Sequence, residues 1–187
     1  EALPLNGSQT IEKILEWIDH QPSEMREIGR TSLIWLANSE MPMSVDGLCE
    51  ALAVKTGLKY GRRSLEPESV FNESVVIDCC KSLAAIDHGG STFVLVHDEV
   101  GKHVNTYWKA HCGKEREHLT RVCLAYLLSD SFRRGPCNDP ESLSDRLRTH
   151  AFLAYAANSW YKHALGAQEV NELVMEFIRS RPHREAA

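Results

Sequence analysis

Apolar residues recur along most of the chain at intervals of three and four positions, which is the spacing of an amphipathic helix. In the first stripe Ile11, Ile14, Leu15 and Ile18 share a face, and Ser8 stands where a helix cap is expected. Further helices are expected at about 23–37, 45–52, 68–81, 100–108, 119–127, 153–164 and 170–178. The polar stretches 55–67 and 129–148 are expected to be loops, and the tail 180–187 is expected to be frayed.

One stretch has the pattern of β-structure instead. Two short runs rich in β-forming residues, Leu83–Asp87 and Thr92–His97, flank the pair Gly89-Gly90, which is typical of a β-hairpin. Three helices followed by a small hairpin is the order of a winged helix. The sequence therefore predicts a mainly α chain with a small β-hairpin, in which a winged helix is flanked by additional helices. The expected domains are a leading helix at 1–22 that joins an upstream domain, a winged helix at 23–97 and a helical extension at 98–187.

Composition narrows the classes of function. The chain has 187 residues, of which 43% are hydrophobic and 25% charged, so a packed fold is expected. The net charge of -5 argues against a partner held by phosphate groups, such as bulk nucleic acid or an anionic membrane. No apolar run approaches the ~20 residues that span a bilayer. The start of the chain has neither Met nor a signal sequence, so we expect a piece of a longer protein.

The six cysteines include no C-x-x-C pair. Cys79 and Cys80 are adjacent on an expected helix, and Cys49 and Cys123 occupy apolar helical positions. Small buried thiols in a reducing compartment explain this distribution better than a disulfide framework does. The cytoplasm is therefore the expected location.

A winged helix often reads DNA with its third helix, so DNA binding is the alternative function. Such a helix needs Arg or Lys for phosphates and base edges. The expected third helix, 68–81, carries three carboxylates, on Glu68, Glu73 and Asp78, against one lysine. Arg62 and Arg63 are the only basic pair nearby, so the charge pattern favours another role.

Several runs resemble one family in the same order along the chain. These runs are Leu33–Ala37, Met41–Val54, Phe93–Asp98, Thr120–Leu128 and Phe152–Trp160. Together they resemble the winged-helix region that follows the NACHT NTPase domain in fungal NOD-like, STAND-class signalling proteins, many of which end in ankyrin or WD40 repeats. The resemblance covers roughly residues 10 to 165. It implies a non-catalytic module whose partners are the upstream NTPase domain and the downstream repeat domain of the same parent.

The resemblance also implies a nucleotide-sensing site. Related switches carry a Met-His-Asp motif between a strand and a helix, and its His is taken to contact the β-phosphate of ADP bound to the NTPase domain. Val96-His97-Asp98 matches the last two residues and the position, with Val in place of Met. An imidazole N–H can donate to a phosphate oxygen, and Asp98 is expected to cap the next helix. The other interpretation is that His97 only ends the strand with its own hydrogen bond satisfied.

Motifs for other chemistry are absent from the sequence. The chain contains neither G-x-x-x-x-G-K-[ST] nor G-x-G-x-x-G, so the resemblance places the ADP or ATP site in the upstream domain and no cofactor is expected in this chain. The sequence also lacks the G-x-S-x-G elbow of hydrolases, so no catalytic residue is assigned. A third hypothesis is an enzyme with an unrecognised site. A buried pair of titratable residues would favour it. His103, His111, Cys112 and His118 lack metal-site spacing, so no metal ligand is assigned. The tryptophans are expected in the core, at positions 17, 35, 108 and 160.

Overall fold

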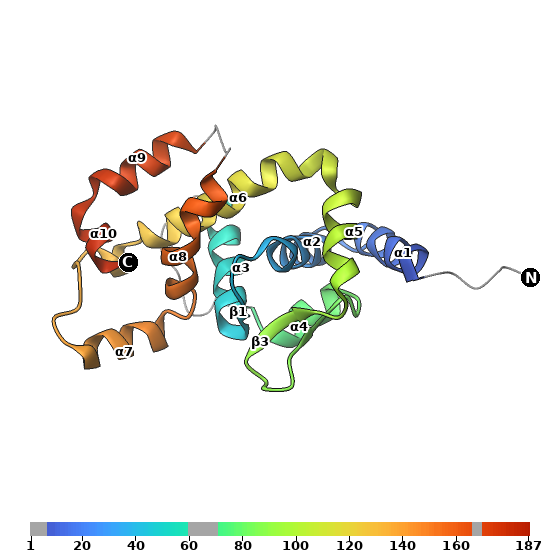
Figure 1. Ribbon diagram of the computed structural model, residues 1–187, viewed down its shortest axis with the longest axis horizontal. Coiled ribbons are helices and arrows are strands. Elements are labelled where there is room, and N and C mark those ends of the chain that lie inside the picture. The colour runs from blue at the N-terminus through green and yellow to red at the C-terminus, as the bar shows by residue number, and fades with distance from the viewer. Residues whose placement is uncertain (1–6, 60–70, 166–169) are drawn as a thin grey trace, which may run out of the picture. The chain divides into compact units, whose positions relative to one another are not determined.

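The computed structural model is mainly helical, with one small antiparallel sheet (Figure 1). It describes residues 7–59, 71–165 and 170–187, except for the side chains of Lys59 and residues 109–116. The described chain forms two compact units, one from residues 1–45 and 72–113 and one from 46–71 and 114–187. The expected domain limits at 1–22, 23–97 and 98–187 stay a prediction, because compactness does not show which segments fold independently.

The helices of the first unit are α1 (Gly7–Asp19), α2 (Ser23–Asn38), α4 (Glu73–Cys79) and α5 (Asp98–Tyr107). Helix α2 packs against the other three, and α1 also packs against α5. Periodic apolar residues make this core, as the sequence predicts: Leu15, Ile18, Leu33, Ile34, Trp35, Val76, Cys79, Val100, Val104 and Trp108. Helix α4 approaches α2 closely, because a Cβ on Gly29 would lie 2.4 Å from the backbone oxygen of Cys79.

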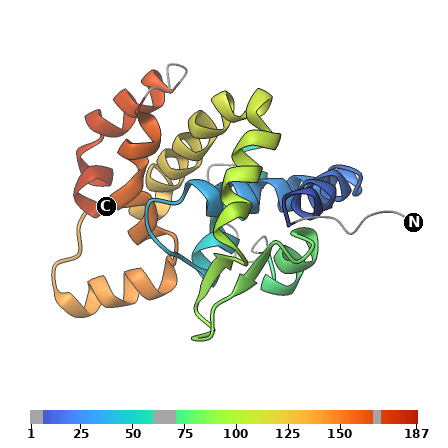
Figure 2. The ribbon, with the colours of Figure 1, turned by 45° about the vertical axis from the view of Figure 1, so that its right-hand side comes forward.

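The sheet of this unit contains β1 (Met43–Ser44), β2 (Ala84–Ile86) and β3 (Thr92–Leu95) in the order β1-β3-β2. The hairpin β2–β3, drawn in light green in Figure 2, confirms the prediction from the two adjacent glycines. Asp87 closes its turn, because Oδ1 accepts hydrogen bonds from the backbone N–H groups of Ser91 at 3.0 Å and Thr92 at 3.1 Å. Strand β1 was not predicted, since two residues are too few to show alternation.

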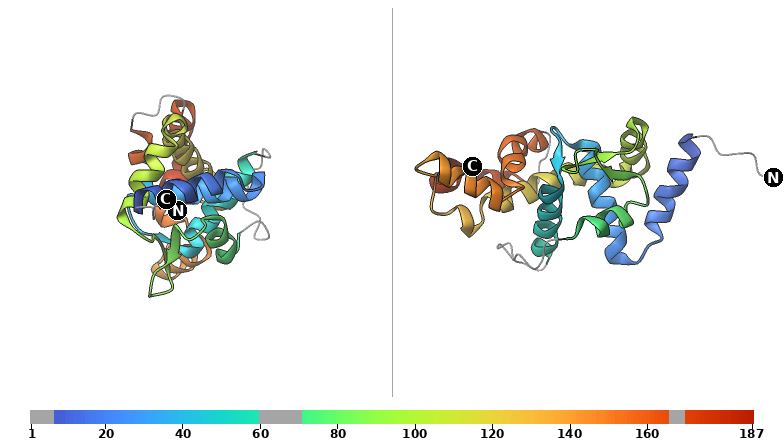
Figure 3. Two further views of the ribbon diagram at one scale, coloured as in Figure 1. Left: turned by 90° about the vertical axis from the view of Figure 1, so that its right-hand side faces the viewer. Right: turned by 90° about the horizontal axis from the view of Figure 1, so that it is seen from below.

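The second unit is helical throughout its described part. It comprises α3 (Val45–Lys59) from Asp46 onward, α6 (Lys109–Leu127) from Lys114 onward, a 3-10 turn η2 (Asp130–Phe132), α7 (Pro140–Thr149), α8 (Leu153–Ala164), α9 (Asn171–Arg179) and α10 (Arg181–Ala186). The last four helices are the orange and red ribbons of Figure 3. Aromatic residues pack together in the core of this unit: Tyr126 packs against Phe132 and Phe152, with ring centroids 5.3 and 5.1 Å apart.

A single carboxylate joins three helices of the second unit. Glu50 on α3 accepts the Tyr126 hydroxyl of α6 at 2.8 Å. It also accepts the backbone N–H groups of Ala151 at 3.1 Å and Phe152 at 3.0 Å, directly before α8 begins. The Glu50 carboxylate thereby occupies the N-terminal end of α8, where orphan donors need a partner.

Several expectations about helix ends were wrong. The stretch 129–148 is not a simple loop, because it contains η2 and most of α7, and the tail forms α10 rather than fraying. Helix α7 begins with Asp139, which accepts from the Ser142 N–H, followed by Pro140 in the first turn. Ser8 lies inside α1 rather than before it. Helix α4 begins at Glu73, while the expected start at Glu68 lies outside the described residues.

The expected burial of the tryptophans was correct for two of them and wrong for one. Trp35 and Trp108 are buried, and Trp160 is half-buried. Trp17, in contrast, is 67% exposed on α1. Within the described residues no helix is both long enough and apolar enough to cross a bilayer.

Candidate functional site

The connection between β3 and α5 contains the residue that the sequence singled out. His97 has extended backbone dihedrals, φ -156° and ψ 144°, and is the N-cap of α5. Its Nδ1 accepts a hydrogen bond from the backbone N–H of Glu99 at 3.1 Å. The expected cap by Asp98 was therefore wrong, because Asp98 is already the first helical residue.

This cap fixes the tautomer of the His97 ring. A nitrogen that accepts a hydrogen bond carries no proton, so a neutral ring that caps α5 has its proton on Nε2. The side chain is exposed, and Nε2 has no hydrogen-bond partner among the described residues. The arrangement thus leaves one oriented N–H donor at the surface, which can bind an acceptor oxygen without disturbing the helix cap.

The first turn of α5 also carries two acidic side chains, whose charges affect the binding of any anion next to His97. Glu99 pairs with Lys102, whose Nζ lies 2.6 Å from Oε1. The hydrogen bond from Lys102 lowers the pKa of the Glu99 carboxyl below its usual range, so the pair is charged on both sides at neutral pH. Asp98 is exposed beside them. Lys102 neutralises the charge of Glu99, whereas the charge of Asp98 would repel a phosphate group.

His97 lines a groove of about 540 Å³ between the first half of α1 and the segments around β2 and β3. The apolar lining comes from Ile11, Ile14, Leu83, Val96 and Val100, and the polar lining includes Ser8, Thr10, Ser82 and Glu99. The turn that leads into Leu83 contains two consecutive non-glycine residues with positive φ, Lys81 at 49° and Ser82 at 67°. Such backbone costs roughly 1–3 kcal/mol per residue, so packing around the turn must hold it in place.

Asp98 lines a different groove of about 580 Å³, together with the α2–β1 connection and β3. Met41, Pro42, Val94 and Gly101 are among its other walls. The two residues of the sequence motif are therefore neighbours in the chain but do not face one shared cavity. Of these two residues, His97 is the one that lines the α1 groove.

The remaining candidate residues are dispersed. His103 Nδ1 lies 3.7 Å from a Glu12 carboxylate oxygen of α1, His118 is half-buried, and the side chains of His111 and Cys112 lie outside the described set. Among the described side chains no three His, Cys, Asp or Glu converge as metal ligands would.

The described cysteines that are buried have the environment of core residues. Burial raises the pKa of the Cys80 thiol to about 12 and raises that of Cys123 further. Cys49 and Cys79 are also buried. A thiol held protonated in this way is a poor nucleophile at neutral pH.

One polar cluster of the first unit could not have been found from sequence. The Asp19 carboxylate of α1 accepts Trp108 Nε1–H at 3.2 Å and lies 3.6 Å from Arg30 Nε of α2. The Arg30 guanidinium also stacks over the Trp108 ring, 5.2 Å from its centroid. These residues are far apart in sequence and form no motif. Their contacts tie α1 to α2 and to the end of α5.

The chain was compared with known proteins at three levels. No family model, no curated protein and no solved structure matches it.

Proposed function

We propose that this chain is a non-catalytic regulatory module of a nucleotide-controlled signalling NTPase. In this proposal it docks on the NTPase domain of its parent and relays the ADP or ATP state to a downstream repeat domain. The resemblance to the NACHT-associated winged-helix region motivates the proposal. The observation that carries it is the capped His97 ring, which leaves Nε2–H as an oriented donor in a groove.

The order of elements supports a winged helix as the scaffold. The chain runs α2, β1, α3, α4, β2, β3, and the sheet order is β1-β3-β2. A winged helix has this same alternation, with its first strand beside the second strand of the hairpin. His97 lies two residues after the last strand and directly before α5, the place that the resemblance assigns to the sensing histidine.

His97 would act through the N–H of Nε2. With Nδ1 engaged by Glu99 N–H, Nε2–H is free to bond a β-phosphate oxygen of ADP held by the NTPase domain. A hydrogen bond to a charged group is worth ~1.5–3 kcal/mol. Asp98 opposes the phosphate, so most of the affinity must come from the NTPase domain. The hydrogen bond from His97 would form only in the closed state, so it would stabilise that state relative to the open one, as a switch requires.

The charge of α4 does not favour the alternative of DNA binding. Glu73 and Asp78 are exposed on this helix, and α4 spans only 73–79. Each exposed carboxylate would repel a phosphate backbone. Arg62 and Arg63 lie outside the described residues.

Variants of His97 in the parent protein separate its two roles. Asp is a good N-cap without a donor, Asn is a good N-cap with an amide donor, and Ala provides neither. We expect His97→Asp and His97→Ala to accelerate ADP release roughly ten- to a hundred-fold, and His97→Asn to have a smaller effect. Stopped-flow release of a fluorescent ADP analogue measures this rate.

Thermal unfolding of the isolated chain is the companion measurement. Only His97→Ala should lower the melting temperature, because the Asp and Asn variants retain the cap. If all three variants release ADP at the wild-type rate, His97 is only a helix cap and the sensing role is wrong.

A further inference from the structure

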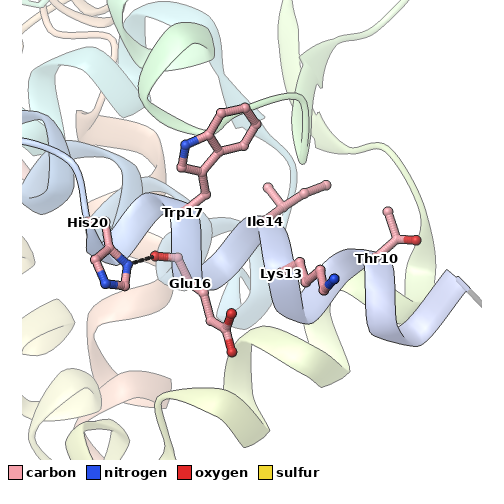
Figure 4. Close-up of a pocket in the computed structure, with 6 residues that line it drawn as sticks. All are labelled: Thr10, Lys13, Ile14, Glu16, Trp17 and His20. Carbon is pink, nitrogen blue, oxygen red and sulfur yellow. Dashed lines mark hydrogen bonds between the residues drawn. The ribbon is translucent and has the colours of Figure 1, made fainter. Parts of the chain in front are cut away.

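The outer flank of α1 is an exposed apolar surface in the first unit. Trp17 is 67% exposed, although tryptophan is a residue that usually buries most of its area. Residues of α1 and the turn that follows it line a groove of about 520 Å³ beside it: Thr10, Lys13, Ile14, Glu16, Trp17 and His20. Figure 4 shows Trp17 and Ile14 next to one another on the same side of the helix. An exposed indole beside a groove is typical of the anchor residues of protein interfaces.

Two charges of opposite sign lie on α1 to one side of this apolar pair. Lys13 and Glu16 are exposed and one helical turn apart, and their charged ends point away from one another in Figure 4. Neither side chain has an ion-pair partner among the described residues. The acidic groups on the inner side of α1 are engaged, since Glu12 faces His103 and Asp19 faces Arg30. Lys13 and Glu16 are thus available to a partner.

We propose that this flank of α1 binds the same flank of a second copy of the chain, with the two helices antiparallel about a two-fold axis. A face that carries a lysine and a glutamate one turn apart is self-complementary under such an axis. Lys13 of each copy then meets Glu16 of the other, and one favourable contact occurs twice. The proposal does not rest on the nucleotide-sensing role, because His97 takes no part in it.

The helical rise fixes the register that the charges require. At 1.5 Å per residue, an axis midway between positions 13 and 16 places Ile14 within ~1 Å of the axis level, and Trp17 ~4 Å from it. The two Ile14 side chains therefore lie at nearly the same level along the helices, at the edge of the face opposite Glu16, because positions 14 and 16 are about 160° apart around a helix. Each Trp17 lies only ~2 Å along the helix direction from Lys13 of the other copy, so its ring can cover the lysine stem and contact the ammonium group.

The size of the surface sets the expected strength. Helix α1 has 13 residues and is ~20 Å long, so its flank offers less than the ~800 Å² per partner of a standard interface. We therefore expect a weak dimer that depends on protein concentration and weakens at high salt, since its ion pairs are exposed.

Sedimentation velocity of the 187-residue chain over a range of concentrations tests this. Wild type should show a monomer–dimer equilibrium, and Trp17→Ala should be monomeric. Lys13→Glu or Glu16→Lys alone should raise the dimer dissociation constant roughly tenfold, since each creates two like-charge contacts. The double exchange Lys13→Glu with Glu16→Lys should restore the wild-type constant. Circular dichroism is the control that shows whether these surface variants are folded.

Tyr161→Ala is the matched control, because Tyr161 is an aromatic residue 50% exposed on α8, and it should leave the equilibrium unchanged. A wild-type chain that stays monomeric up to about 1 mM would overturn the proposal. A dimer that survives Trp17→Ala, or a double exchange that fails to restore dimerisation, would overturn it equally, because the proposal requires both the anchor and the antiparallel register.

Discussion

Glu50 provides the most demanding test of how the second unit is held together. The perturbation is Glu50→Ala, which removes the acceptor of three hydrogen bonds. Of the three donors, the Tyr126 hydroxyl and the Phe152 N–H belong to residues at most 1% exposed, whereas Ala151 is half-buried and its N–H can be hydrated. The cost therefore comes mainly from two buried donors that lose the Glu50 carboxylate as their acceptor.

The expected magnitude follows from that count. The loss of its acceptor costs a buried donor about 1–3 kcal/mol, so with two such donors Glu50→Ala should reduce the free energy of unfolding by roughly 2–6 kcal/mol. Glu50→Gln retains one acceptor oxygen but turns an amide N–H₂ toward a donor, and should cost about 1.5–3 kcal/mol. Burial and the nearby Glu50 charge raise the pKa of Tyr126 well above its usual value, so Tyr126 remains a donor at any moderately alkaline pH.

Urea unfolding of the isolated chain, followed by circular dichroism, measures these differences. Asp46→Ala on the same helix is the control, because Asp46 is exposed in the first turn of α3 and should contribute no more than about 1 kcal/mol. Tyr126→Phe combined with Glu50→Gln completes a double-mutant cycle that isolates their pairwise energy. If the free energy of unfolding of Glu50→Ala lies within about 0.5 kcal/mol of the wild-type value, the hydrogen bonds of Glu50 do not stabilise the second unit.

Three further predictions concern local features. Gly29→Ala should destabilise by roughly 1–3 kcal/mol in the same urea assay, because its Cβ would meet a backbone oxygen at 2.4 Å, whereas Gly7→Ala, with nothing within 4 Å, should not destabilise. Hydrogen bonds from Ser142 hold the pKa of Asp139 below its usual range, so its stabilisation is present at neutral pH and lost as pH falls through that lowered pKa; the melting temperature of Asp139→Asn should fall less steeply with acid than that of wild type. Cys80, with a pKa raised to about 12, should react with a disulfide reagent only as fast as the first unit unfolds, and rapid labelling of native protein would contradict its burial.

The fold could be predicted where local spacing determines it. The hairpin follows from Gly89-Gly90 between β-forming runs, and the helices of the core follow from apolar periodicity. Helix α7 was missed although its signal was present, since Asp139 and Pro140 form a capping pair at the start of a polar helix. Trp17 was misplaced because periodicity assigns residues to a face only approximately. It lies one position from the buried Ile18, which is a rotation of about 100° around α1.

The candidate site was only partly predictable. The resemblance pointed to His97, but its role as the cap of α5 depends on backbone dihedrals that no pattern encodes. The separation of His97 and Asp98 into different grooves depends on where α1 and α2 pack. The cluster of Asp19, Arg30 and Trp108 joins residues brought together only by tertiary packing, so local sequence could not reveal it.

The first unit is assembled from two stretches of chain, 1–45 and 72–113, with residues 46–71 assigned to the other unit. Its strand β1 pairs with β3 through Met43 and Phe93, so the sheet cannot close until the chain has been synthesised beyond that strand. The chain loses conformational entropy when it closes so long a loop, and the favourable contacts form only afterwards. This order slows folding. No single cut of the chain yields both units intact. Truncation at any point between 46 and 113 leaves at least one core incomplete, so function must be mapped by point substitution rather than by deletion.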